Sequence, residues 1–102
     1  MRLTIIRDTN SVIVDGEGYT IDCSMLPRDL HAVQWYGMAG EVEYAMTRCD
    51  HCGVASKKPN EVIKDLAPYQ FYVDAHASAK AAHAAAVAAA QEALKNAAGP
   101  ES

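Results

Sequence analysis

The sequence has few basic residues and no long apolar run. It contains 9 Lys and Arg against 13 Asp and Glu, a net charge of −4, and its longest basic run is Lys57-Lys58. Binding to a phosphate backbone needs clustered Lys and Arg, so we expect no nucleic-acid partner. A membrane span needs about 18 consecutive apolar residues, and a secretion signal needs an apolar core that Arg7 interrupts here. We therefore expect neither membrane association nor secretion.

Sequence signatures of catalysis are also missing. The chain has no Gly-rich phosphate loop, no His-Glu-x-x-His and no Gly-x-Ser-x-Gly. The segment 15–18, Asp-Gly-Glu-Gly, is better interpreted as a turn than as a carboxylate site. Cys49 lies near His51, but neighbouring loop residues rarely hold the geometry in which an imidazole activates a thiolate. We therefore expect a protein without enzymatic activity.

The three cysteines are the residues best suited to chemistry. An odd number of cysteines fits a reducing cytoplasm better than a disulfide framework. Cys49 and Cys52, followed by Gly53, match the first half of a zinc knuckle, but no second pair follows them. Three interpretations remain open: bound zinc, a reversible disulfide between Cys49 and Cys52, or two cysteines without a role. Further zinc ligands would come from Cys23, His31, His51 or a second chain.

The first part of the chain predicts a small antiparallel sheet of four to five strands. Residues 75–98 include 14 alanines among 24 residues, so the core must come from the residues before them. Apolar, β-branched runs separated by turn residues predict a three-strand meander, and two further runs around a Gly-bounded loop predict a hairpin. The segment 47–60 lacks periodicity and is expected to be a cysteine-containing loop. The expected strands are 3–7, 11–15, 19–23, 31–36 and 41–46, and a short helical turn is expected at 59–66.

The last part of the chain predicts one long helix. Pro68 suits a first helical turn, nothing interrupts the helix before about Asn96, and Gly99-Pro100 ends it. About 30 residues at about 1.5 Å each give a length of about 45 Å, whereas a 100-residue globule has a radius of gyration of about 13 Å. The fold class is therefore α+β: residues 1–66 form the sheet domain, 67–98 a projecting helix, and 99–102 a disordered tail.

The projecting helix is expected to contact another chain. It carries few charges for a solitary helix, and its heptad spacing would stack His76 and His83 in successive layers of a parallel homo-oligomer. A neighbouring row of alanines would serve close helix packing equally well, and the alternatives are a helix that folds back or frays and a disordered low-complexity tail. The heptad positions are Tyr69, Val73, His76, Lys80, His83, Val87, Ala90 and Leu94.

Large aromatic side chains are the other candidates for an interface. Trp35, Tyr36, Tyr69 and Tyr72 are the residue types that most often anchor protein contacts. Burial in the core is the simpler account of Trp35.

Three motifs in order along the chain carry a resemblance to a known family. They are HAVQWYGMAGEVEY at 31–44, PNEVI at 59–63 and YQFYVDA at 69–75. In this order they resemble small proteins encoded in the tail-fibre region of tailed bacteriophages and prophages, over roughly residues 1–82. The segment between the first two motifs is often short in that family, so the cysteine loop resembles an insertion. The resemblance implies a virion tail component or a tail-fibre assembly factor, without catalytic residues.

These observations lead to one favoured hypothesis and two alternatives. The favoured one is a non-enzymatic structural protein of a phage tail or tail-fibre apparatus, made in the host bacterial cytoplasm and located in the virion. Its partners would be other tail or fibre proteins and copies of itself, with a trimer suggested by analogy with fibre symmetry. The alternatives are a cytoplasmic chaperone for fibre assembly that is absent from the virion, and a small zinc-binding adaptor.

Overall fold

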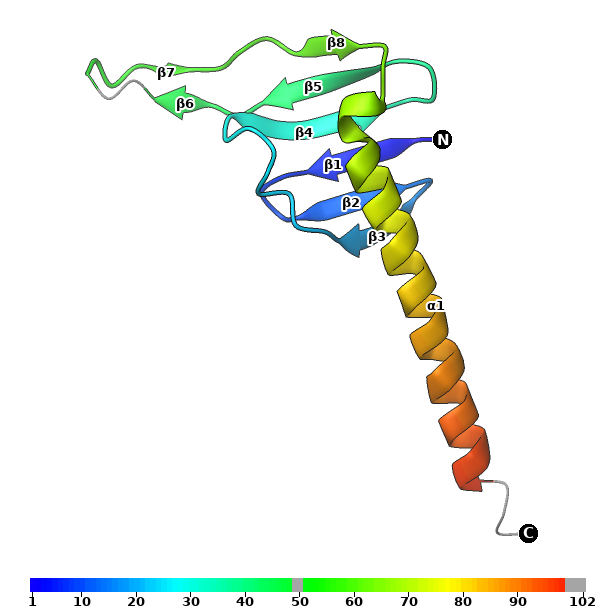
Figure 1. The fold of residues 1–102 in the computed structure, drawn as a ribbon. Coiled ribbons are helices and arrows are strands. Elements are labelled where there is room, and N and C mark those ends of the chain that lie inside the picture. Colours follow the sequence, from blue (N-terminus) through cyan, green and yellow to red (C-terminus); the bar gives the residue numbers. More distant parts are fainter. Residues whose placement is uncertain (49–50, 99–102) are drawn as a thin grey trace.

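A computed structural model of the chain describes residues 1–48 and 51–98. Its main body is a six-stranded antiparallel sheet with the strand order β3-β2-β1-β4-β5-β8 (Figure 1). A separate two-stranded sheet is made of β6 and β7, and the chain ends in one long helix. The α+β class predicted from the sequence is confirmed. The elements are β1 (Leu3–Ile6), β2 (Ser11–Val14), β3 (Glu17–Thr20), β4 (Leu30–Trp35), β5 (Gly40–Tyr44), β6 (Thr47–Arg48), β7 (Ala55–Ser56), β8 (Glu61–Ile63), the 3-10 helix η1 (Ala67–Tyr69) and α1 (Gln70–Ala98).

The first hairpin is tighter than the sequence suggested. Asp15 and Gly16 both have positive φ, 49° and 85°, as a two-residue turn of the kind that joins twisted antiparallel strands requires. The strand β3 therefore begins at Glu17, opposite Val14, and Gly18 lies inside the strand. The third strand, expected at 19–23, begins two residues earlier, because only Asp15 and Gly16 of the Asp-Gly-Glu-Gly segment form the turn.

The helical turn expected at 59–66 is wrong. Residues Glu61–Ile63 form β8, which pairs antiparallel with β5 and brings Ile63 opposite Gly40. Val62 and Ile63 are β-branched, which favours an extended backbone over a helix. The edge of β5 also offers unpaired backbone groups, and pairing with them decides the conformation of a run too short to show a period.

The cysteine-containing segment forms the end of a long hairpin. Because β5 pairs with β8 and β6 pairs with β7, the chain runs out from the sheet and returns beside itself (Figure 1). We call residues 45–60 the hairpin arm. The sequence predicted a loop here, since strands of two residues are too short to produce a recognisable alternation.

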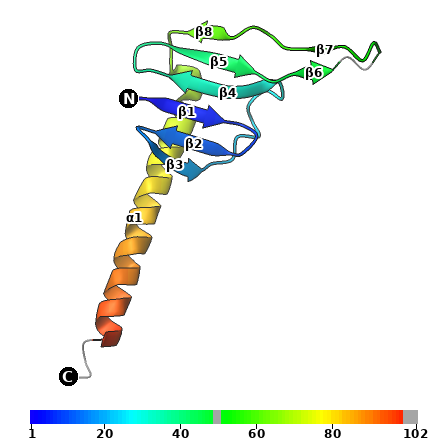
Figure 2. The same cartoon turned by 180° about the vertical axis from the view of Figure 1, so that it is seen from behind.

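The helix α1 covers one face of the sheet and then extends past it. It crosses over the strands and leaves beyond β3, and from behind the opposite face of the sheet is seen uncovered by any described element (Figures 1 and 2). The core between sheet and helix contains Leu3, Ile5, Val12, Cys23, Leu26, Leu30, Val33, Trp35, Val42 and Tyr72. Every residue from 80 to 96 is exposed. The radius of gyration, 19.4 Å, and the longest extent, 74 Å, reflect this projection, which the sequence predicted.

Candidate functional site

The start of α1 is fixed to the sheet by a polar cluster at β3. His76 is only 4% exposed, and its Nε2 donates a hydrogen bond to the Glu17 carbonyl oxygen at 2.7 Å. The Tyr19 ring meets His76 edge-on, with centroids 5.0 Å apart, and also meets His83 at 5.9 Å. Lys80 Nζ lies 3.7 Å from a Glu17 carboxylate oxygen. These contacts hold the helix across β2 and β3.

This cluster corrects the predicted helix seam in its first half. The residues Tyr72 and His76 are buried against the chain's own sheet, and Tyr69 and Val73 pack at the edge of the same core. The heptad spacing is real, but its first part matches the sheet surface, which takes the place predicted for a partner helix. Beyond the sheet, the large apolar side chains Val87 and Leu94 are exposed.

The aromatic residues predicted to anchor an interface also fall into a buried group and an exposed one. Trp35 and Tyr72 lie in the core, as the simpler account of Trp35 proposed, and burial raises the pKa of the Tyr72 and Tyr69 hydroxyls. Tyr36 is different, because β4 ends at Trp35 and the next side chain points to the opposite side, where it is 58% exposed. Tyr36 is therefore the predicted aromatic anchor with the greatest exposed surface.

The candidate zinc ligands that lie within the described residues are not brought together in a group of three or more. Cys49 lies outside the described residues, and Cys52 is exposed near the end of the hairpin arm. Cys23 is in the core, where burial raises the pKa of its thiol and makes it a poorer ligand. His31 Nδ1 lies 3.2 Å from the Asp8 carboxylate. Among residues 1–48 and 51–98, no group of three or more His, Cys, Asp or Glu side chains is arranged to hold a metal.

The hairpin arm has a tether that the sequence did not reveal. Lys58 Nζ lies 2.5 Å from the Asp29 carboxylate and 5.2 Å from the centre of the Tyr44 ring. Tyr44 donates a 2.7 Å hydrogen bond to Glu61, and the backbone amide of Ala45 donates to the Asp29 carbonyl oxygen at 2.7 Å. The hydrogen bond from Lys58 lowers the pKa of Asp29. Metal was one predicted way to restrain a long loop, and here these contacts fix the base of the arm.

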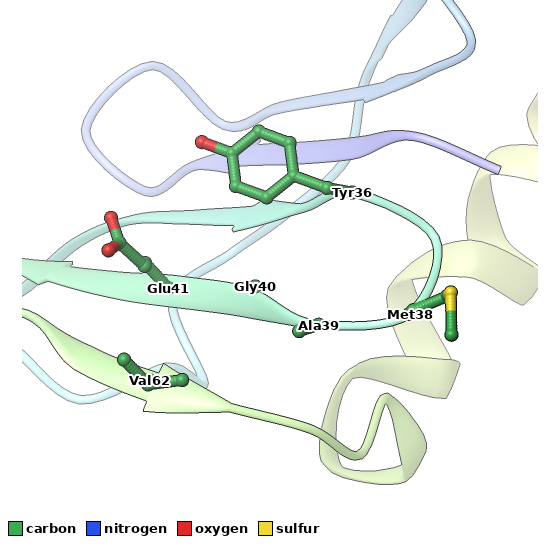
Figure 3. Close-up of a pocket in the computed structure, with 6 residues that line it drawn as sticks. All are labelled: Tyr36, Met38, Ala39, Gly40, Glu41 and Val62. Atoms are coloured by element: carbon green, nitrogen blue, oxygen red, sulfur yellow. The ribbon is translucent and has the colours of Figure 1, made fainter.

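An open pocket lies at the end of the sheet where β4 turns into β5. It has a volume of about 390 Å³, and Figure 3 shows its lining: Tyr36, Met38, Ala39, Gly40, Glu41 and Val62. We call it the end pocket. Glu41 pairs with Val62 across β5 and β8. The residue after Glu41 in β5 is Val42, whose side chain points into the core, so Glu41 and its partner Val62 lie on the opposite face, which α1 leaves uncovered.

The end pocket is the centre of an exposed apolar patch. Met38 is 89% exposed, Val62 is 64% exposed, and Met1 lies beside Gly37 in the adjoining turn. The guanidinium of Arg2 lies 5.5 Å from the centre of the Tyr36 ring, so a positive charge stands beside this aromatic side chain, while the Glu41 carboxylate belongs to the pocket lining itself. Apolar patches with a charged rim are typical of protein contact sites. Sequence reasoning missed Met38 and Val62 because it assigned them to a loop and a helical turn.

Comparisons with protein-family models, with curated proteins and with solved structures found no match to this chain. The helices in the described part of the chain include none with the length and apolar character that a bilayer crossing needs.

Proposed function

We propose that this protein is a non-enzymatic structural component of a bacteriophage tail or tail-fibre apparatus that acts through protein–protein contacts. The bacteriophage assignment rests on the three motifs at 31–44, 59–63 and 69–75 and on their resemblance to tail-fibre-region proteins. The virion is the proposed location, and other tail or fibre proteins and further copies of this chain are the proposed partners.

The observation that carries the contact role is the projecting part of α1. From residue 80 to residue 96 the helix has no contact that buries a side chain, yet it carries only Lys80, Glu92 and Lys95 as charged residues. In proteins most of the stability of a helix comes from the packing of one face against other elements, rather than from helix propensity alone. A projecting helix with exposed Val87 and Leu94 is therefore best explained as a segment that packs on another chain.

Self-association tests the contact role. We expect the full chain to form oligomers whose mass, measured by light scattering, rises with protein concentration, and a chain ending at Ala84 to stay monomeric. This cut keeps Tyr72, His76 and His83, so the contacts between helix and sheet are retained. Identical masses for the two chains at every concentration would contradict self-association through the helix.

The location is tested separately. Mass spectrometry of purified virions should detect the chain in a fixed ratio to the known tail proteins. A chain that is abundant in infected cells and missing from finished virions would instead be an assembly chaperone, and the structural role would be refuted.

A further inference from the structure

We propose that the end pocket of one molecule binds the C-terminal part of α1 from a second copy, with Leu94 seated among Tyr36, Met38 and Val62. The inference rests on the self-association proposed above and identifies both surfaces that meet. The contact is head-to-tail, since the pocket and the helix end are different parts of the molecule.

Leu94 lies on the same face of α1 as the residues that pack on the sheet. His76, His83, Val87 and Leu94 follow one another at intervals of seven, four and seven residues, so they lie on one face of the helix. The first half of that face is packed on the chain's own sheet, and the second half continues past β3 with Leu94 72% exposed. The same face that packs on a sheet inside the molecule is thus presented to a sheet outside it.

The pocket offers a matching surface. Its lining includes the flexible thioether of Met38 and the aromatic ring of Tyr36, and both can pack against an aliphatic side chain. A volume of about 390 Å³ leaves room for one leucine and part of the helix around it. The small residues that surround Leu94 on α1 let the helix backbone approach the pocket closely.

Charges on both sides are complementary. Lys95 follows Leu94 and would reach the Glu41 carboxylate on the pocket lining. The C-terminal turn of a helix carries partial negative charge, and Arg2 lies beside Tyr36 at the pocket. Both pairs place opposite charges together, which fixes the orientation of the incoming helix.

A parallel bundle of helices explains the same exposed residues less well. Since the seam meets the sheet as far as His83, whose ring contacts Tyr19, only Val87, Ala90 and Leu94 of the predicted positions are left to face another helix. Stable coiled coils sustain the pattern over at least three to four heptads. A head-to-tail contact needs only the end of the helix and forms rings or filaments when it repeats.

The contact is small, so we expect weak and concentration-dependent association. Stable protein interfaces bury about 800 Å² on each partner, and a single helix end in a shallow pocket covers less. Leu94→Ala should weaken association about tenfold or more, as loss of a central apolar anchor does. Circular dichroism should be unchanged, because alanine keeps the helix and Leu94 makes no core contact.

A charge exchange on the full chain tests the pairing directly. E41K and K95E should each weaken association at least about fivefold in sedimentation velocity at low salt, because each variant places like charges at the contact. The double variant E41K/K95E should associate like the wild type. A 1:1 mixture of the two single variants should do so as well, since each pocket then finds a helix end of opposite charge. K57E, a matched charge change on the exposed hairpin arm, is the control and should have no effect.

The outcomes separate this inference from the proposed function. If K95E and L94A weaken association while E41K behaves as the wild type, the helix is the joint but the end pocket is not its receptor, and the inference is overturned. Failure of the mixture to recover also overturns it, because a head-to-tail contact requires recovery. A wild-type chain that stays monomeric at every concentration overturns the inference and the proposed self-association, while its presence in virions would leave the structural role standing.

Discussion

At the scale of single residues, Gly40 has the least room for a side chain among the described glycines. A Cβ at this position would overlap the Gln34 carbonyl oxygen and lie 3.0 Å from the Trp35 Cα, both parts of the neighbouring backbone. Gly40→Ala should therefore lower the free energy of unfolding by about 2 kcal/mol, measured by urea denaturation.

Gly18→Ala is the matched control for that change. A Cβ on Gly18 meets only the Ile13 side chain, at 3.3 Å, which can move. The free energy of unfolding should change by about 1 kcal/mol or less. Equal losses for the two variants would contradict the account of Gly40.

The hydrogen bond from Tyr44 to Glu61 makes a prediction about alkaline pH. The bond to this carboxylate raises the pKa of Tyr44 to about 12. The unfolded phenol ionises near pH 10, so Tyr44 stabilises the fold below pH 10, and this contribution is lost as the pH rises from about 10 to about 12. Glu61→Gln should lower the pKa of Tyr44, because a neutral amide replaces the carboxylate.

Ultraviolet absorbance of ionised tyrosine measures this effect. The difference between the titration curves of the wild type and Tyr44→Phe isolates the Tyr44 phenol, and the same difference in the Glu61→Gln background should show a midpoint at lower pH. A midpoint that does not move would rule out the carboxylate as the cause.

At the scale of elements, the docking of α1 depends on His76. His76→Phe keeps an aromatic ring against Tyr19 but removes the part-buried hydrogen bond from the imidazole to the Glu17 carbonyl oxygen. We expect a loss of about 1–3 kcal/mol in the free energy of unfolding. His83→Ala, on the same helix face but exposed, should change it by about 0.5 kcal/mol or less. The reverse order of effects would mean that the hydrogen bond does not secure the helix.

Most elements were predictable because their signals are local. The strands β1, β2, β4 and β5 follow from apolar, β-branched runs between turn residues, and α1 follows from alanine content and its Pro and Gly boundaries. The strand β8 was not predictable, since a three-residue strand at a sheet edge is formed by pairing with β5. The short strands of the hairpin arm were missed for the same reason.

The candidate site was less predictable than the fold. Heptad spacing predicted one face of α1 as a contact surface, but it could not indicate that the first half of this face packs on the chain's own sheet and that Val87 and Leu94 lie beyond the sheet. Met38 and Val62 meet at the end pocket only because β8 returns beside β5. A contact between residues so far apart in the chain leaves no periodic signal.

At the scale of the whole molecule, the helix has a docked half and a projecting half that should differ in their effect on stability. A chain ending at Ala84 should unfold within about 0.5 kcal/mol of the full chain, because the removed residues bury no core side chain. A chain ending at Asp74 loses His76 and should be several kcal/mol less stable. Thermal unfolding at low concentration, where association is weak, measures both. Equal stability of the two shortened chains would contradict this division.

The nested pairing of the hairpin arm also has a practical consequence. Because β5 and β8 pair at the sheet and Lys58 contacts Asp29 at the arm's base, we expect a longer chain between Cys52 and Ala55 to leave the geometry of the core unchanged. Loop extensions carry a small entropic cost that grows only slowly with length. We therefore expect the segment 52–55 to accept an inserted epitope tag or fluorescent peptide without disturbance of the sheet, the helix or the end pocket.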